Sequence, residues 1–249
     1  MHTEYHKWWS PSLNQDMEMK VYGHAGKPVI AFPTSSGRFF DYENFGMVDA
    51  CRPWIDTGQI MLFAVDSVDA QSWDNLKVTP AERNKRHLEY DQHILTEVVP
   101  LAQSYGLTSR AFVSTGCSAG AYHAANFFFR HPDVFDAVIS LSGLFRLDRP
   151  QFHLTGQDLA DVYFNSPLSY LPDLNDPWYT DRYRKSQIIV CCGQGAWEGP
   201  PIEDALALRT LLESKGIPCW VDLWGTDVVH DWPWWKKQIA YFLGRMRLV

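Results

Sequence analysis

The sequence predicts an α/β fold in which a mostly parallel central sheet carries helices on both faces and an antiparallel hairpin lies at the N-terminus. Continuous apolar runs at 29–32 and 60–65 indicate strands that are buried on both faces. Segments with helical spacing, such as 80–105, alternate with strand-like runs along the chain. Near the N-terminus, residues 17–21 alternate between apolar and polar, which is typical of a strand with one covered face.

The N-terminal hairpin is expected around residues 17–26. Met17, Met19 and Val21 alternate with glutamate and lysine. A turn is expected directly afterwards, at Gly23-His-Ala-Gly26, because glycine clusters commonly separate strands. The chain would then lead inward to the first buried strand.

Beyond the hairpin, strands and helices alternate regularly. In the helix expected over Pro80–Tyr105, Leu88, Ile94 and Val98 share one face, and Gly106 supplies a stop. The remaining strands are expected at 29–32, 60–65, 111–115, 137–142, 188–192 and 219–224, and the remaining helices at 119–131, 202–215 and 232–248. This alternation predicts parallel strands with helices covering both faces of the sheet.

A single domain is expected to span residues 1–249, because a chain of this length is near the upper end of what one hydrophobic core supports. The stretch 144–186 interrupts the alternation with four prolines and a short helical piece at 157–164. It is too long for a simple connection, so we interpret it as an insertion over the active face.

Composition and charge exclude several classes of function. The formal net charge is −7 and the basic residues are scattered, which disfavours nucleic acid as a partner. No apolar run reaches the roughly 20 residues that span a bilayer, and the first residues lack the apolar core of a signal peptide. We therefore expect a cytoplasmic protein without membrane contact.

The cysteines indicate neither a disulfide framework nor a metal site. Their number, five, is odd, and Cys191 and Cys192 are adjacent, so reduced buried thiols are expected. The spacings of structural zinc sites and of zinc proteases are missing from the sequence. We expect no metal.

A G-x-S-x-G motif at Gly116–Gly120 identifies Ser118 as the candidate nucleophile. The motif lies between a predicted strand and a predicted helix, where a nucleophilic serine occupies a cramped turn and glycine is needed at 116 and 120. The turn places Ser118 at a helix N-terminus, where backbone N–H groups favour negative charge on a substrate oxygen. The N–H of Ala119 is the first candidate oxyanion donor.

His230 is the candidate general base among nine histidines. It lies between the last predicted strand and the last predicted helix, at the edge where the loops after parallel strands converge. The other histidines belong to helices or to the N-terminal region, except for His153 in the insertion, which stays a rival.

Glu198 is the candidate third member of a catalytic triad. In this architecture the acid usually follows the serine and precedes the histidine in the sequence, and Glu198 lies in the loop after the strand at 188–192. Asp227, which shares the histidine loop, and Asp204 remain alternatives. The acid would hold the imidazole in the correct tautomer and stabilise its cation.

The loop at 33–37 is expected to complete the oxyanion hole, with the N–H of Ser35 as the second donor and the hydroxyl of Ser35 or Ser36 as an addition. Trp197 and Trp232 flank the acid and the histidine, and we expect both to contact substrate. Further tryptophans at 73, 234 and 235 suggest an aromatic pocket mouth suited to a hydrophobic acyl or aryl group. Cys117 is interpreted as a packing residue.

These motifs resemble the esterase branch of the α/β-hydrolases that includes S-formylglutathione hydrolase (esterase D) and the mycolyltransferases. The resemblance rests on Gly116–Gly120, Tyr90–His93, Asn165-Ser166-Pro167 and His230-Asp231-Trp232. It implies an α/β-hydrolase fold, a Ser-acid-His triad and no cofactor. Two departures are a glutamate at 198 instead of aspartate, and Pro33-Thr34 where many hydrolases have His-Gly.

The hypothesis is a serine esterase that hydrolyses a small-molecule carboxylic ester through an acyl-enzyme on Ser118, with His230 as base. One alternative is an acyltransferase that uses the same acyl-enzyme. Another is a binding module that retains the hydrolase fold without turnover. Self-association is left open, because sheets of this kind often dimerise at exposed ends but no residue here decides it.

Overall fold

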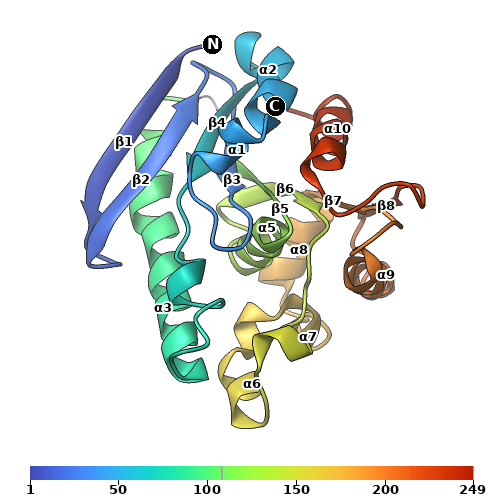
Figure 1. Cartoon of the computed structure of the whole chain (residues 1–249). Helices are drawn as coiled ribbons and strands as arrows, with labels where there is room; N and C mark the ends of the chain where they lie inside the picture. The colour runs from blue at the N-terminus through green and yellow to red at the C-terminus, as the bar shows by residue number, and fades with distance from the viewer. Residues whose placement is uncertain (108, 249) are drawn as a thin grey trace.

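The computed structural model describes residues 1–107 and 109–248. Within these residues the strands form one eight-stranded sheet in the order β1-β2-β4-β3-β5-β6-β7-β8 (Figure 1). The strands are β1 (Thr3–Ser10), β2 (Gln15–Tyr22), β3 (Lys27–Phe32), β4 (Ile60–Val65), β5 (Phe112–Cys117), β6 (Phe135–Leu141), β7 (Gln187–Cys192) and β8 (Trp220–Leu223). The pairs β1·β2 and β2·β4 are antiparallel and all others are parallel. The predicted fold class is thus confirmed.

The hairpin is real, but its predicted turn was wrong. β1 and β2 pair along their whole length and turn at residues 11–14, where Ser10 lies opposite Gln15. The segment Gly23–Gly26 instead leads from β2 to β3, which do not pair, because β4 lies between them. Glycine is needed at position 26 because the backbone of Gln59 lies very close to it. A Cβ there would lie 2.3 Å from the carbonyl carbon of Gln59.

Helices cover both faces of the sheet (Figure 1). One face packs against α3 (Pro80–His93), α5 (Ala119–Arg130), α8 (Pro177–Lys185) and α9 (Gly199–Ser214), in a core that includes Phe127 and Leu208. The other face packs against α2 (Met47–Asp56) and α10 (Trp232–Leu243), in a core that includes Ile239. Neither α2 nor the short α1 (Asp41–Asn44) was predicted from the sequence, and α10 ends five residues before its predicted end.

The expected helix over 80–105 is present, but its buried face differs from the predicted one. The chain runs through α3, the π-helical turn η2 (Ile94–Val98) and α4 (Val99–Gln103), and it begins with a capping box between Thr79 and Glu82. Ile94 and Val98 are buried as expected, whereas Leu88 is 44% exposed. The buried positions of α3 are mostly polar: Arg83, His87, Tyr90, Asp91 and His93.

The remaining elements are short. The stretch 144–186 contains η3 (Pro150–Phe152), α6 (Gln157–Asp161), η4 (Tyr163–Asn165), α7 (Pro167–Tyr170) and α8, and η1 (Asp69–Gln71) follows β4. α6 and α7 lie together at the lower end of the molecule in Figure 1. None of the helices in the described part of the chain has the length and apolar character needed to cross a membrane.

Glu97 fastens the edge strand β1 to the helical segment behind it. Its carboxylate accepts hydrogen bonds from Trp8 Nε1 (2.9 Å), Ser10 Oγ (2.8 Å) and the backbone N–H of Ser12 (3.1 Å). Burial raises the pKa of Glu97, but the hydrogen bonds from Ser12, Trp8 and Ser10 outweigh burial and lower it from 4.5 to about 2.

We expect the Glu97→Gln variant to be less stable than the unaltered protein at pH 7, and the difference to shrink in acid. A carboxyl group whose folded pKa is depressed contributes stability above its unfolded pKa of 4.5 and loses it as the pH falls toward 2. Urea unfolding of both proteins at several pH values between 7 and 2 measures this. A stability difference independent of pH would contradict the assignment.

Candidate active site

Ser118 occupies a strained turn between β5 and α5. Its backbone has φ 57° and ψ −120°, a conformation that side-chain-bearing residues rarely adopt. Space around the turn is minimal: a Cβ at Gly116 would lie 2.3 Å from the carbonyl carbon of Gly120, and one at Gly120 would lie 2.3 Å from the carbonyl oxygen of Phe32. Glycine is therefore the only residue that fits at either position of the motif.

The sheet holds this turn in place from both sides. β5 lies between β3 and β6, and the N–H of Ser118 donates to the carbonyl oxygen of Leu141 at the end of β6 (2.9 Å). α5 then begins at Ala119, and the first N–H groups of a helix have no acceptor within the helix. The arrangement presents Ser118 and the start of α5 at the carboxyl edge of the sheet.

A cavity of about 400 Å³ opens at this edge. Ser118, Ala119, Ser35 and His230 all line it, so the structure brings together the predicted nucleophile, base and oxyanion donors. The side chains of the oxyanion loop are engaged elsewhere, because the hydroxyls of Ser35 and Ser36 both donate to Asp74 Oδ2, at 2.5 and 2.8 Å. Both hydroxyls are therefore occupied, and the backbone N–H of Ser35 stays the predicted second oxyanion donor.

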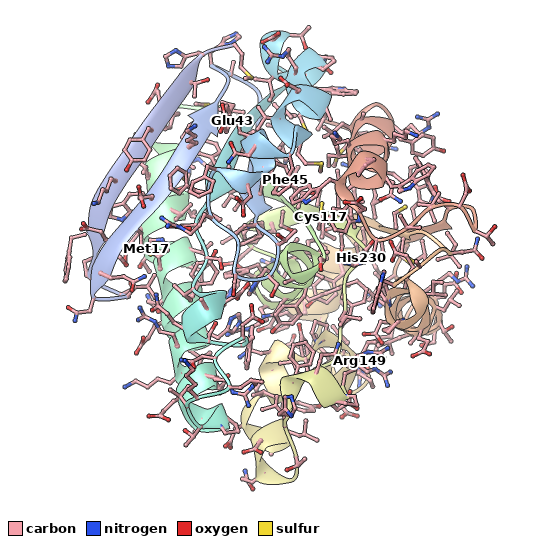
Figure 2. All side chains as sticks on the ribbon, in the orientation of Figure 1. Met17, Glu43, Phe45, Cys117, Arg149 and His230 are labelled. Carbon is pink, nitrogen blue, oxygen red and sulfur yellow. The ribbon has the colours of Figure 1, made fainter. Side chains whose placement is uncertain are left out.

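His230 and Glu198 form the second part of the site. The side chain of Glu198 is fully buried at the start of α9, and its Oε2 lies 3.6 Å from His230 Nδ1. This separation exceeds a hydrogen bond, but catalytic pairs are often long in the absence of substrate. In Figure 2, His230 lies in the loop that leads into α10, facing the region between α5 and α9.

Ser142, which the sequence analysis did not single out, holds Glu198 from the other side. Its hydroxyl donates to Glu198 Oε1 (2.7 Å) and accepts from Trp235 Nε1 (2.9 Å). The ring of Trp235 in turn packs edge-on against the ring of His230, with centroids 4.9 Å apart. The only signal for Ser142 in the sequence is its position directly after a buried strand, next to the strand that carries Ser118.

The alternative candidates lie in other environments. Asp204 is buried and fully engaged by Arg149 (2.5 Å) and the N–H of Phe145 (2.7 Å). Asp227 is exposed, and among the described residues no hydrogen bond or ion pair joins it to His230. His153 is also exposed and does not line the cavity. Glu198 is the carboxylate that the structure places behind His230.

The aromatic residues divide into two groups. Trp197, which is 86% exposed, and the buried Trp73 line the cavity. Trp232 does not line it and instead stacks on Phe45, with ring centroids 4.5 Å apart. Cys117 is buried, and burial raises the pKa of its thiol well above the ordinary value, which fits a packing residue. Across the described ranges, no group of three or more metal-ligating side chains is placed to hold an ion.

The sheet order, the helices on both faces and the serine turn after β5 define an α/β-hydrolase. A family model described as "Putative esterase" matches residues 10–246, so the chain belongs to this esterase family. The predicted family and the predicted class of activity, an esterase, are thereby confirmed.

Solved structures share this fold over nearly the whole chain. A ferulic acid esterase has 17% identity and a TM-score of 0.76, with 97% of this chain and 96% of that chain covered. MPT51 of Mycobacterium tuberculosis has 16% identity and a TM-score of 0.78, covering 98% and 97%. An S-formylglutathione hydrolase of Agrobacterium tumefaciens has 13% identity and a TM-score of 0.74, covering 97% and 93%. No curated protein matches the sequence.

Replacing Gly120 by alanine is expected to destabilise the protein by more than about 3 kcal/mol, because the new methyl group would press against the backbone oxygen of Phe32. Gly199→Ala is the matched control, since a Cβ at this first residue of α9 meets nothing within 4 Å. Urea unfolding compares the two variants. Equal stability of both would show that the turn is looser than described.

Proposed function

We propose that the chain is a serine esterase in which Ser118 is the nucleophile, His230 the general base and Glu198 the acid. The observation that carries the proposal is that Ser118, on its strained turn, and His230 line one cavity while buried Glu198 lies behind the imidazole. The same three types of residue in this chain order define the triad of α/β-hydrolases.

The reaction proceeds through an acyl-enzyme. Ser118 Oγ attacks the ester carbonyl carbon while His230 Nε2 takes the hydroxyl proton, and the N–H groups of Ala119 and Ser35 stabilise the oxyanion. The carbon–oxygen bond to the alcohol then breaks, and His230 returns the proton to the leaving oxygen. Water, deprotonated by His230, attacks the acyl-enzyme, which releases the carboxylic acid and restores Ser118.

Glu198 acts through His230. Ser142 occupies its Oε1, so Oε2 is left to face Nδ1 of the imidazole, which fixes the tautomer and stabilises the imidazolium. Because Trp235 both donates to Ser142 and packs on the imidazole, one side chain positions the acid and the base together.

The cavity supports a small-molecule ester as substrate. A volume of about 400 Å³ is within the range of ligand sites, and Leu144, Tyr122 and Phe152 give it apolar walls. The five cysteines are all unpaired, which supports our inference that the protein works in a reducing compartment such as the cytoplasm.

Acyl transfer to an alcohol or amine would use the same acyl-enzyme. The two reactions differ in the molecule that takes the acyl group from Ser118, which is water in hydrolysis and an alcohol or amine in acyl transfer. Release of free acid in buffer without an added acceptor therefore identifies the hydrolase. A binding module would give neither product. Ser118 and His230 line one cavity and Glu198 lies 3.6 Å from the imidazole, which supports turnover.

A fluorophosphonate is expected to label Ser118 alone, and Ser118→Ala is expected to lose labelling and the hydrolysis of nitrophenyl esters. The adduct is located by mass spectrometry of the digested protein. Ser214→Ala, at the exposed end of α9, serves as the control because its hydroxyl bonds only its own helix. An unlabelled Ser118 together with no ester cleavage would favour the binding module.

Ser142→Ala is expected to lower kcat roughly tenfold and to leave KM within about twofold, because the hydroxyl, although Ser142 lines the cavity, is engaged by Glu198 and Trp235 and positions the acid. Ser140→Ala is the matched control: this buried serine lies two residues earlier and donates to the carbonyl oxygen of Ala121 (3.0 Å) instead. Steady-state kinetics on a nitrophenyl ester separate the two. A kcat loss equal in both variants would mean that only packing was disturbed.

A further inference from the structure

The wall of the cavity beyond Ser118 combines aromatic rings with buried polar groups that the proposed ester chemistry does not use. It is formed by Asp69 and Trp73 from the segment after β4 and by Tyr122 and His123 from α5. His123 lies five residues after Ser118, which is about 7.5 Å along the axis of a helix. A group recognised at this wall would therefore belong to the body of the substrate and not to its reacting ester bond.

Asp69 is the centre of this wall. Its side chain is 3% exposed, and its Oδ1 lies 2.8 Å from Nε2 of His123, which is 1% exposed. The His123 ring is itself held by stacking on His87 at 5.6 Å and by packing against Tyr90 at 5.9 Å. The packed His123 ring therefore holds the Asp69 carboxylate in one orientation.

The second oxygen of Asp69 lacks a partner. Among the described residues, Oδ2 accepts no hydrogen bond although it is buried, and two further buried atoms of this wall, Trp73 Nε1 and His123 Nδ1, also lack a partner. A buried carboxylate oxygen without a donor is costly, so such atoms in folded proteins are nearly always paired with protein, water or ligand. Because Asp69 lines the substrate cavity, a donor on the substrate is in a position to supply the missing hydrogen bond.

The charged side chains that line the cavity indicate which kind of hydrogen-bond donor the substrate carries. Two carboxylates, Asp69 and Asp74, line it, whereas no lysine or arginine of the described chain does. An anionic group would be repelled there, and a cation would be attracted by the carboxylates and by the aromatic ring of Trp73, which lines the same cavity. A protonated amine combines positive charge with N–H donors.

We propose that the ester substrate carries a protonated amine and that Asp69 Oδ2 accepts a hydrogen bond from it. This inference rests on the proposed function, since it names the substrate class of the same site. His123 acts as a positioning residue that fixes the orientation of the Asp69 carboxylate, and the indole of Trp73 provides a face for the cation.

Binding of small probes tests the inference without turnover. Calorimetric titration of the Ser118→Ala protein compares 2-phenylethylamine, 2-phenylethanol and phenylacetate, which share a ring and differ in charge. We expect the amine to bind roughly tenfold more tightly than the alcohol and phenylacetate not to bind, because charged hydrogen bonds are much stronger than neutral ones. Equal binding of amine and alcohol would overturn the inference and indicate that water satisfies Asp69.

Asp69→Asn in the same protein is expected to remove most of the tenfold preference for the amine, since an amide keeps the shape but not the charge. The ratio of the two dissociation constants is read within one folded population, so partial unfolding does not change it. Asp74→Asn alters the other carboxylate of the cavity and is the comparison: this side chain is exposed and its Oδ2 is already engaged by Ser35 and Ser36, so we expect a smaller loss of the preference. If Asp74→Asn abolishes the preference and Asp69→Asn does not, the assignment to Asp69 is wrong.

The binding probes test the amine site and the esterase assay tests the proposed function, so either can fail while the other succeeds. Absent labelling of Ser118 with intact amine selectivity would sink the proposed function and leave the amine site standing. Ester hydrolysis without amine selectivity would support the proposed function and overturn the amine site. Should Asp69→Asn not fold, the comparison of the three probes in the Ser118→Ala protein still decides the matter.

Discussion

The contact between the start of α5 and the end of β3 is the constraint on which the rest of the site depends. Gly120 lies against the carbonyl oxygens of Phe32 and Pro33, and Gly116 lies against Gly120, so the helix begins as close to the sheet as a polypeptide backbone permits. This closeness forces Ser118 into its strained conformation, at a cost of about 1–3 kcal/mol. The same closeness brings the N-terminus of α5 and the loop after β3 to one cavity, which both of them line.

The strain is distributed over four neighbouring strands. Six residues other than glycine have positive φ in the described chain, and four of them follow β3, β5, β6 and β7: Ser36, Ser118, Ser142 and Trp197. Each therefore lies in a loop at the carboxyl edge of the sheet. Backbone strain persists only where the surroundings enforce it, and here the rigid parallel strands do so. The polar groups of the site are set by backbone that could not relax without losing its sheet contacts.

Much of the site was predictable because its signals are local. Ser118 has a motif between a strand and a helix, and His230 and Glu198 follow from the order of loops after strands. Ser142 was not predictable, because its role depends on the pairing of β6 with β5 and on a side chain from α10. The edge strand β1 was also missed. Its outer positions carry exposed aromatics such as Trp9, so its sequence lacks the apolar–polar alternation that identifies a strand with one buried face. In α2, Pro53 lies inside the helix and obscured a helical spacing of buried residues.

The interior between α3 and α5 shows the main limit of hydrophobic periodicity as a guide. There buried side chains, together with the partly buried Arg130, form a polar row: Asp69, His123, His87, Asn126, Asn165, Arg130 and Asp91. Burial lowers the pKa of His87 well below its ordinary value, so this ring stays neutral within the row. Such a row is stable only if nearly every member is paired, and its hydrogen bonds tie Asn165 of the stretch 144–186 to α5. Among the described residues, four buried atoms of the row lack a hydrogen-bond partner: Asp69 Oδ2, His123 Nδ1, His87 Nδ1 and Asn126 Oδ1. Asp69 is at the end of the row that lines the cavity, so the side chains that order α5 also influence what the cavity accepts.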